Sequence, residues 1–153
     1  MRAFRIASQR HGGTVASAFS GQGSLYGDGR WHHRGRLAVY VAQHASLATL
    51  EILVHLDRAS DIVPHVLYEI DVPDDMITVP RDLPPDWQNN IDAARQFGDA
   101  WLDGKTAPAL KVPSVVTPSE INLVLNPAHP AFRLDWVLRG PEAVRFDPRL
   151  LLK

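Results

Sequence analysis

Two stretches of the chain have the apolar pattern of β-strands, and they differ in how much of the strand is buried. Residues 37–43, LAVYVAQ, form a continuous apolar run that is typical of a strand buried on both faces. Residues 65–72, HVLYEIDV, alternate, with Glu69 and Asp71 facing away from the apolar positions, as in a half-buried strand. Shorter strands are expected at residues 4–8, at residues 143–147, and twice within residues 112–127, where prolines bound the apolar runs.

Two other segments repeat their apolar residues at helical spacing. In residues 45–59, ASLATLEILVHLDRA, we expect Ser46 to cap a helix that is apolar almost all the way round and therefore central. In residues 89–103 the apolar positions recur every three or four residues, and we expect Gly104 to end this helix. Residues 10–29 are rich in Gly and Ser and are expected to form a loop.

These elements predict an α+β fold with a mixed sheet, in a single compact domain that covers residues 1–153. A chain of 153 residues, 45% hydrophobic and 22% charged, can bury its own core without a disulfide or a structural metal. The net charge of −1 argues against direct binding of nucleic acid. The absence of cysteine excludes disulfides, thiolate metal ligands and a thiol nucleophile.

Targeting and membrane signals are not apparent in the sequence. The first ten residues, MRAFRIASQR, lack the apolar core of a signal peptide. No stretch approaches the ~20 apolar residues that span a bilayer. We therefore expect a soluble, cytoplasmic protein that does not contact a membrane.

Glu51 is the first candidate for chemistry, because its predicted helix offers it few polar neighbours. An unpaired buried carboxylate is costly, so Glu51 must become protonated, find a cation or line a cavity. Pairing with Arg30 for purely structural reasons is one alternative. Exposure on the helix surface, with His55 four residues further on, is another.

Arg30 and Tyr40 are the next candidates. Arg30 lies between glycines and the entry to a strand, in GDGRWHHRGR, and its planar guanidinium suits a phosphate or a carboxylate. The alternative is a solvated loop arginine or one stacked on Trp31. Tyr40 shares a strand face with Ala38 and Ala42, which leaves room for a ligand over its ring, although a core tyrosine would show the same pattern.

Several familiar motifs are missing. The segment GQGSLYG has neither the spacing nor the following helix of a dinucleotide-binding loop, and no phosphate-binding P-loop is present. His32 and His33 are adjacent and complete no set of metal ligands, so no metal is predicted. Ser114 lacks the surroundings of a hydrolase nucleophile but can contact a ligand. Asn122 and Asn126 face the same way on a strand, where they satisfy loop backbone or shape a pocket.

Taken in order, these segments resemble the RES-domain toxins of RES–Xre toxin–antitoxin modules. The likeness runs over almost the whole chain, through FRIA, GDGRWHHRGRLAVYVAQHASLATLEILVH, GDAWL, KVPSVVTPSEINLVLNPAHPAF and RFDPRLL. The family's arginine, tyrosine, glutamate and serine fall on Arg30, Tyr40, Glu51 and Ser114. The chain departs from the family pattern at His32 and in the entry YGDGRW.

The resemblance implies a fold like that of ADP-ribosyltransferases and an enzyme that consumes NAD as its substrate. Cleavage of the nicotinamide–ribose bond by water or phosphate would deplete NAD and arrest growth. Glu51, Arg30 and Tyr40 would be catalytic, and substrate binding would use Arg30 and Tyr40 together with Ser114, Asn122 and Asn126. Without a ligand, Arg30 and Glu51 are expected to pair. The acceptor, which is water, phosphate or a protein, is left open.

The resemblance also implies a partner, an Xre-like antitoxin with a helix-turn-helix DNA-binding domain, and a homodimer within the toxin–antitoxin complex. Two alternatives to NAD cleavage stay open. One is an ADP-ribosyltransferase that modifies a cellular protein. The other is a module that binds NAD or a partner without catalysis.

Overall fold

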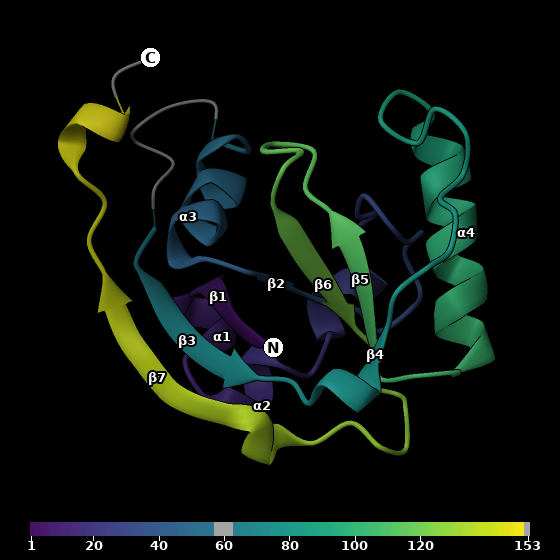
Figure 1. Cartoon of the computed structure of the whole chain (residues 1–153). Coiled ribbons are helices and arrows are strands. Elements are labelled where there is room, and N and C mark those ends of the chain that lie inside the picture. The colour runs from purple at the N-terminus through teal and green to yellow at the C-terminus, as the bar shows by residue number, and fades with distance from the viewer. Residues whose placement is uncertain (57–62, 152–153) are drawn as a thin grey trace.

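The fold is built on one seven-stranded sheet, seen in a computed structural model that describes residues 1–56 and 63–151. The strands are β1 (Arg2–Ser8), β2 (Val39–Ala42), β3 (His65–Asp71), β4 (Ile77–Thr78), β5 (Ala109–Pro113), β6 (Ile121–Leu125) and β7 (Val137–Val144). Their order across the sheet is β4-β5-β6-β2-β1-β3-β7 (Figure 1). Neighbouring strands are antiparallel except β4 and β5, which are parallel, so the predicted mixed sheet is confirmed.

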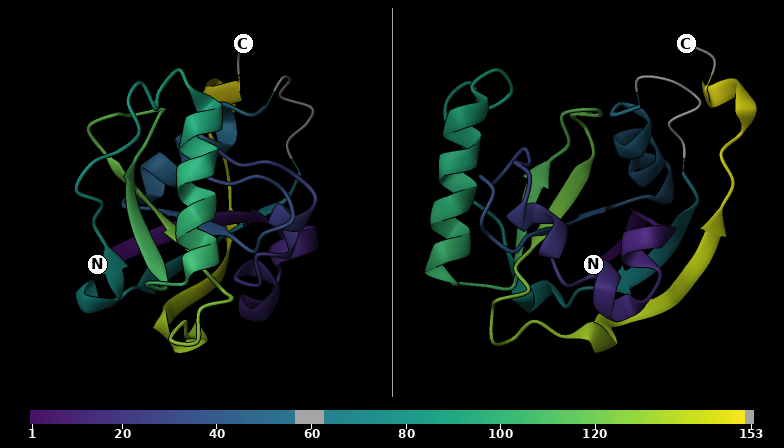
Figure 2. Two further views of the ribbon diagram at one scale, coloured as in Figure 1. Left: turned by 90° about the vertical axis from the view of Figure 1, so that its right-hand side faces the viewer. Right: turned by 180° about the vertical axis from the view of Figure 1, so that it is seen from behind.

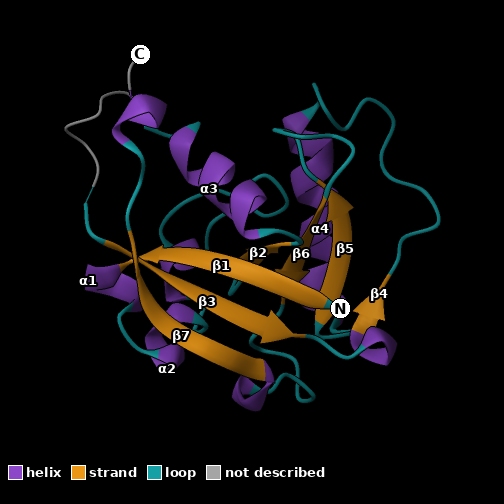
Figure 3. Cartoon of the chain, turned by 60° about the vertical axis from the view of Figure 1, so that its left-hand side comes forward, coloured by secondary structure: helices purple, strands orange, loops and turns teal. Residues whose placement is uncertain are grey.

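The sheet changes direction where β1 meets β2. β1 pairs with β3 over its full length, from Arg2 opposite Asp71 to Ser8 opposite His65. It pairs with β2 at Phe4 and Ala42 alone. As a result β1, β3 and β7 fan out on one side of this junction and run at a steep angle to β5 (Figure 3).

Four α-helices in the described part of the chain pack on this sheet. They are α1 (Gln9–Gly12), α2 (Val15–Ala18), α3 (Ala45–Leu53) and α4 (Ile91–Gly104). The long helix α4 stands against β5 and β6, whereas the short helices α1 and α2 lie at the other end of the molecule (Figure 2). α3 directly follows β2 and packs on β1.

The core consists of three clusters of buried residues, and each cluster involves different helices. The largest cluster lies inside the bend of the sheet around Tyr68, Ile70 and Leu123, and is closed by Phe19 after α2. A second cluster joins α4 to β5 and β6. A third, smaller cluster holds α3 on β1 and β2 through Leu47 and Ala48. None of the described helices is long and apolar enough to span a membrane.

Several expected elements need correction. The helix at residues 45–59 begins at Ala45 with His44 as its N-cap, so Ser46 is an exposed residue inside the helix and does not cap it. Leu50 and Val54 are exposed, so α3 is not surrounded by apolar packing. The helix ends at Leu53, and residues 57–59 of the expected segment lie outside the described residues.

The Gly- and Ser-rich segment is more structured than its composition suggests. Thr14 and Ser17 form a capping box at the start of α2, because each side chain accepts a hydrogen bond from the other's backbone N–H. The last strand, expected at residues 143–147, is the longer β7, which runs from Val137 to Val144. The two-residue strand β4 was not expected, because so short a segment carries no periodicity.

We predict that Gly98→Ala destabilises the protein, because Gly98 is where α4 touches the loop that follows Arg30. A Cβ atom on Gly98 would lie 1.8 Å from the Trp31 carbonyl oxygen, which is backbone and cannot rotate away. Overpacking of this kind costs roughly 1–3 kcal/mol, more than the helix propensity that alanine gains. Urea unfolding measures the change.

The matched control is Gly104→Ala at the end of the same helix. There the nearest atom to an added Cβ is a Thr106 methyl at 3.9 Å. This variant should unfold within about 0.5 kcal/mol of the unmodified protein. Equal stability of the two variants would show that the contact between Gly98 and Trp31 does not constrain the fold.

Candidate active site

Three cavities share Tyr40 as a lining residue. The wide cavity, about 780 Å³, lies between β1 and residues 17–28. The middle cavity, about 250 Å³, lies between β1, β2 and α3. The outer cavity, about 480 Å³, lies between α3, the start of α4 and residues 113–116. Tyr40 lines all three, so this face of β2 is the centre of the candidate site.

Glu51 points from α3 into the middle and outer cavities and is held by two hydrogen bonds on one oxygen. Ser114 Oγ donates to Oε1 over 2.8 Å, and Asn122 Nδ2 donates to the same atom over 2.7 Å. No residue that the structure describes donates to Oε2. The carboxylate is therefore fixed in orientation with one oxygen left open to the cavity.

Ser114 holds Glu51 because the turn after β5 fixes its own hydroxyl. Ser114 is fully buried, and its Oγ accepts hydrogen bonds from the backbone N–H groups of Val116 and Thr117. With two donors on its lone pairs, the hydroxyl can only donate toward Glu51. Ser114 thus positions the Glu51 carboxylate.

Asn122 and Asn126 share a face of β6 but lie at opposite ends of it. Asn122 lies beside Glu51, and its Oδ1 is buried without a hydrogen-bond partner among the described residues. Asn126 is 1% exposed, and its side chain hydrogen-bonds to backbone groups. It donates to the Leu102 carbonyl and accepts from the Ala128 N–H. Asn122 thus shapes the pocket, whereas Asn126 satisfies nearby backbone, and its contacts give no support to a role in substrate binding.

Arg30 lines the middle and outer cavities together with Glu51. Its guanidinium donates to the Gln88 carbonyl over 3.1 Å, a contact exposed to solvent. Within the described residues, no ion pair joins Arg30 to Glu51, so the expected pairing is wrong. Both charges face the same space without neutralising each other.

Tyr40 lines the cavities, and its hydroxyl is engaged in contacts within the protein. The phenolic oxygen accepts from the Trp31 N–H over 3.1 Å and lies 2.8 Å from His32 Nδ1. Burial raises the pKa of Tyr40 and lowers the pKa of His32, so burial favours the neutral form of both side chains. This close packing needs Gly29, where an added Cβ would lie 2.3 Å from the His32 ring.

Arg5 is a site residue that the sequence analysis missed. It comes from the middle of β1 and lines both the wide and the middle cavity. Its Nε donates to the Ala18 carbonyl and its Nη1 to the Tyr40 carbonyl. An arginine inside an apolar strand, FRIAS, was the available signal, because such a residue must find polar partners when the strand is buried.

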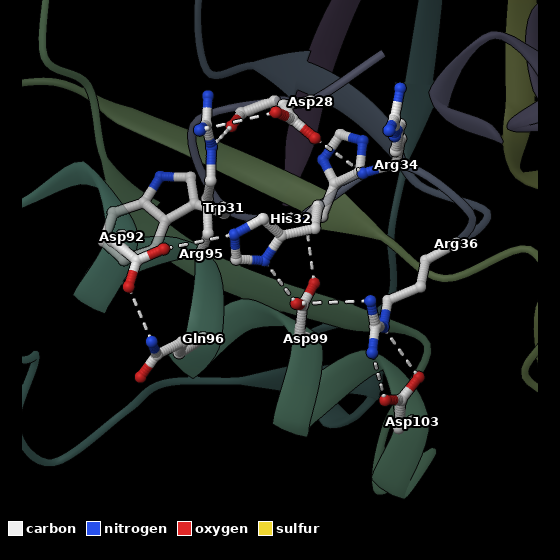
Figure 4. A network of polar contacts seen from close by, with 12 residues as sticks. Asp28, Trp31, His32, Arg34, Arg36, Asp92, Arg95, Gln96, Asp99 and Asp103 are labelled. Carbon is white, nitrogen blue, oxygen red and sulfur yellow. Dashed lines mark hydrogen bonds and ion pairs between the residues drawn. The ribbon is translucent and has the colours of Figure 1, made fainter. Parts of the chain in front are cut away.

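The loop that carries Arg30 is anchored on α4 by a network of charged side chains (Figure 4). Arg95 donates to the Gly29 carbonyl over 2.8 Å. Asp99 accepts from the His33 backbone N–H over 2.9 Å and from the His33 ring over 2.7 Å, and it also pairs with Arg36. The polar contacts on both sides of Arg30 thus hold its backbone in place.

No group of three His, Asp or Glu side chains that could hold a metal occurs in residues 1–56 and 63–151. His33, for example, is engaged by Asp92 and Asp99. The adjacent histidines thus serve separate purposes, His32 in the packing around Tyr40 and His33 in the loop anchor.

Residues 2–147 match the RES domain family. A protein of Yersinia enterocolitica serotype O:8 / biotype 1B named Toxin Res is 36% identical over 98% of this chain and 99% of its own length. A Sphingobium sp. (strain YBL2) protein named Prs ADP-ribosylating toxin is 36% identical over 90% of this chain and 89% of its own. The fold is similar to one chain of the crystal structure of the M. tuberculosis MbcT–MbcA toxin–antitoxin complex, with a TM-score of 0.70 at 20% identity, over 98% of this chain and 86% of that chain.

We predict that His33 stabilises the fold more at low pH than at high pH. The hydrogen bond to Asp99 raises the pKa of His33 above its ordinary value of 6.5. Because the folded protein holds this proton more tightly than the unfolded chain, the contribution is complete below pH 6.5 and disappears as the pH rises through the raised pKa. Burial lowers the pKa of His32, which has the opposite effect on the pH dependence of stability. His32 is present both in the unmodified protein and in a His33 variant, so its effect cancels when the two are compared.

The measurement is urea unfolding of the unmodified protein and of His33→Gln at about pH 5.5 and about pH 8.5, on either side of the ordinary histidine pKa. The stability difference between the two proteins should be larger at the lower pH. A difference that is the same at both pH values would show that Asp99 does not favour protonated His33.

Proposed function

Because the chain belongs to the family of RES-domain toxins, we propose that it is the toxin of a toxin–antitoxin pair and breaks the nicotinamide–ribose bond of NAD+. The observation that carries this proposal is the orientation of Glu51. One of its oxygens is fixed by Ser114 and Asn122 and the other is open to a cavity shared with Arg30 and Tyr40.

The chemistry requires one well-placed anion. As the bond between C1′ and the nicotinamide nitrogen breaks, the electron pair leaves with nicotinamide, and positive charge develops on the ribose. A carboxylate that is already in position stabilises this charge more than it stabilises the ground state. The oxygen of the acceptor then bonds to C1′, and its proton passes to the surrounding water. Nicotinamide leaves as a neutral molecule, so no second carboxylate is needed as a general acid.

The other residues take supporting roles in this proposal. Arg30 binds phosphate through its planar guanidinium. The ring of Tyr40 forms the wall against which the nicotinamide packs, since its hydroxyl is already engaged. Asn122 orients the Glu51 carboxylate through its amide nitrogen.

Transfer of ADP-ribose to a protein is the second candidate, favoured by the name of the Sphingobium relative, Prs ADP-ribosylating toxin. The same four side chains serve this reaction, with a protein side chain in place of water or phosphate. The outer cavity, bounded by the exposed Val115 and Val54, is where such an acceptor would approach.

We propose an antitoxin as the partner, and we retain the prediction that it is an Xre-like helix-turn-helix protein. The similar fold in a toxin–antitoxin complex supports an antitoxin of some kind. Such a partner would supply the DNA affinity that a chain of net charge −1 lacks. The homodimer and the cytoplasmic location stay predictions.

Glu51→Gln should keep the fold and lose nicotinamide release. The glutamine oxygen can still accept from Ser114 and Asn122, but the open position then carries a neutral amide. Loss of the charge should lower turnover by roughly 10²–10³-fold, the effect of removing one oxyanion-hole donor elsewhere. Chromatographic measurement of nicotinamide from NAD+, with water alone, with phosphate or with a cell extract, gives both the rate and the acceptor.

The matched control is Glu142→Gln on β7, a half-exposed glutamate that lines none of the three cavities and pairs with Arg139. It should leave turnover unchanged. Near-normal nicotinamide release by folded Glu51→Gln protein would contradict the proposed role of Glu51.

Arg30→Lys should weaken NAD+ binding about tenfold, because a lysine ammonium cannot reproduce the paired donors of a guanidinium. Calorimetric titration of NAD+ into protein that also carries Glu51→Gln prevents turnover during the measurement. Arg139→Lys on the exposed part of β7 is the control and should bind normally. Equal affinity for the Arg30 variant would remove Arg30 from the phosphate site.

A further inference from the structure

The hydroxyl of Tyr40 is the point to which the loop around Arg30 is tied. The Trp31 backbone N–H donates to it over 3.1 Å, and His32 Nδ1 lies 2.8 Å from it. The same loop closes on itself, since the Gly29 N–H donates to the His32 carbonyl over 3.0 Å. Arg30 lies between these contacts, so the position of its backbone depends on Tyr40 and His32.

His32 is enclosed where it meets Tyr40. It is 2% exposed, and the centroid of its ring lies 5.6 Å from that of Tyr40. A Cβ atom added at Gly29 would lie 2.3 Å from the His32 ring, so the ring has no room to move on that side. His32 lines the wide cavity but neither the middle nor the outer one. It can therefore influence the space around Glu51 and Arg30 only through Tyr40 and the loop.

The contact with Tyr40 suits a neutral imidazole better than a charged one. His32 Nε2 is buried and has no hydrogen-bond partner among the described residues. Protonation makes both ring nitrogens donors, so Nε2 would carry a buried N–H without an acceptor. Nδ1 could then only donate to the Tyr40 oxygen, which already accepts from the Trp31 N–H, and could not accept from the hydroxyl. The charged ring therefore weakens the contact that holds the loop.

The groups around His32 set the balance between its neutral and charged forms. Burial lowers its pKa below the ordinary value of 6.5. Asp99 on α4 and Asp28 in the loop favour the charged form, whereas Arg95 on α4 opposes it. The hydroxyl of Tyr40 is itself neutral, since burial raises its pKa. Because burial has the largest effect, the imidazole of His32 is predominantly neutral at neutral pH.

We propose that His32 is a positioning residue, which through the Tyr40 hydroxyl holds the Tyr40 ring and the Arg30 loop in place only while its imidazole is neutral. The inference rests on the proposed function for the reaction whose rate it affects. Turnover is then favoured at neutral pH and falls as the pH drops through the lowered pKa of His32, below 6.5. His33 has the opposite dependence, because its hydrogen bond to Asp99 raises its pKa.

A double-mutant cycle tests whether His32 acts through Tyr40. His32→Leu removes both ring nitrogens and should lower nicotinamide release about tenfold at neutral pH, the effect of losing one buried hydrogen bond. Tyr40→Phe keeps the aromatic ring but lacks the hydroxyl. In that background His32→Leu should cost less than about twofold, because the contact is already gone. Equal losses in the two backgrounds would show that His32 does not act through the Tyr40 hydroxyl.

His32→Asn separates position from charge, and serves as the second variant if His32→Leu does not fold. Its amide can hydrogen-bond to the Tyr40 hydroxyl and carries no charge, so most of the turnover at neutral pH should be kept. From about pH 8 to about pH 4.5, release by the unmodified protein should fall relative to this variant, by up to about tenfold per pH unit below the pKa of His32. Groups common to both proteins cancel in this ratio. A ratio that stays constant would overturn the requirement for a neutral ring.

The matched control is His129→Asn. His129 Nδ1 also makes a local hydrogen bond, with the Ala131 N–H over 3.0 Å, and His129 lines none of the three cavities. Release by the unmodified protein relative to this variant should not change over the same pH range. The same pH-dependent ratio for His129→Asn and His32→Asn would overturn the specific role of His32.

Amide hydrogen exchange measured by NMR gives a readout that does not depend on turnover. The Trp31 amide should exchange about three- to tenfold faster in His32→Leu and in Tyr40→Phe than in the unmodified protein, and at a nearly normal rate in His32→Asn. The amide of Leu123, a fully buried residue of β6, should not change. Normal exchange of Trp31 in His32→Leu, or an equal change at Leu123, would show that His32 does not specifically hold the loop.

Failure of this inference is distinguishable from failure of the proposed function. If the unmodified protein releases nicotinamide but neither the pH profile nor the exchange of Trp31 depends on His32, this inference falls and the proposed function stands. If the unmodified protein releases none while the exchange of Trp31 depends on His32, the proposed function falls and the positioning contact stands.

Discussion

The fixed oxygen of Glu51 is the constraint on which the rest of the site depends. Its two donors come from different elements, Ser114 from the turn after β5 and Asn122 from β6, while Glu51 itself comes from α3. The carboxylate can therefore be held in place only when α3, β5 and β6 have docked together. Its second oxygen then faces the cavity at a position set by the whole fold and not by the flexibility of one side chain.

The helix α4 supplies the same precision for Arg30, although α4 carries no proposed catalytic group. Arg95 and Asp99 hold the loop backbone before and after Arg30, and Gly98 allows that loop to touch the helix. A loop alone would leave the guanidinium mobile, and the entropy of ordering it would weaken ligand binding. The polar network thus orders the loop that carries Arg30, and in the proposed site it makes no contact with the ligand itself.

The sequence located β1, β2, β3 and β6, because apolar runs and apolar alternation are local signals that survive in the fold. It overlapped β5 and β7 by only a few residues and missed β4. It failed where tertiary packing decides. The burial expected for the helix around Glu51 was wrong, since Leu50 and Val54 are exposed and only one side of α3 packs on the sheet. The sequence placed Asn126 and Asn122 on the same face of a strand. The hydrogen bond from Asn126 to the Leu102 carbonyl of α4 could not be predicted from their spacing. Arg5 was missed because its partners lie on distant segments.

The lack of an ion pair between Arg30 and Glu51 suits the proposed reaction. A paired carboxylate would have to break its contact before it could stabilise a developing cation, and that reorganisation would add to the barrier. Here the carboxylate is held by neutral donors, and Arg5 and Arg30 are held by carbonyl oxygens. In the proposed reaction, the charges would act fully on a ligand that brings an anionic phosphate to Arg30 and a ribose that becomes cationic to Glu51. Separation of the charges, maintained by neutral partners, therefore fixes the direction in which such a ligand binds.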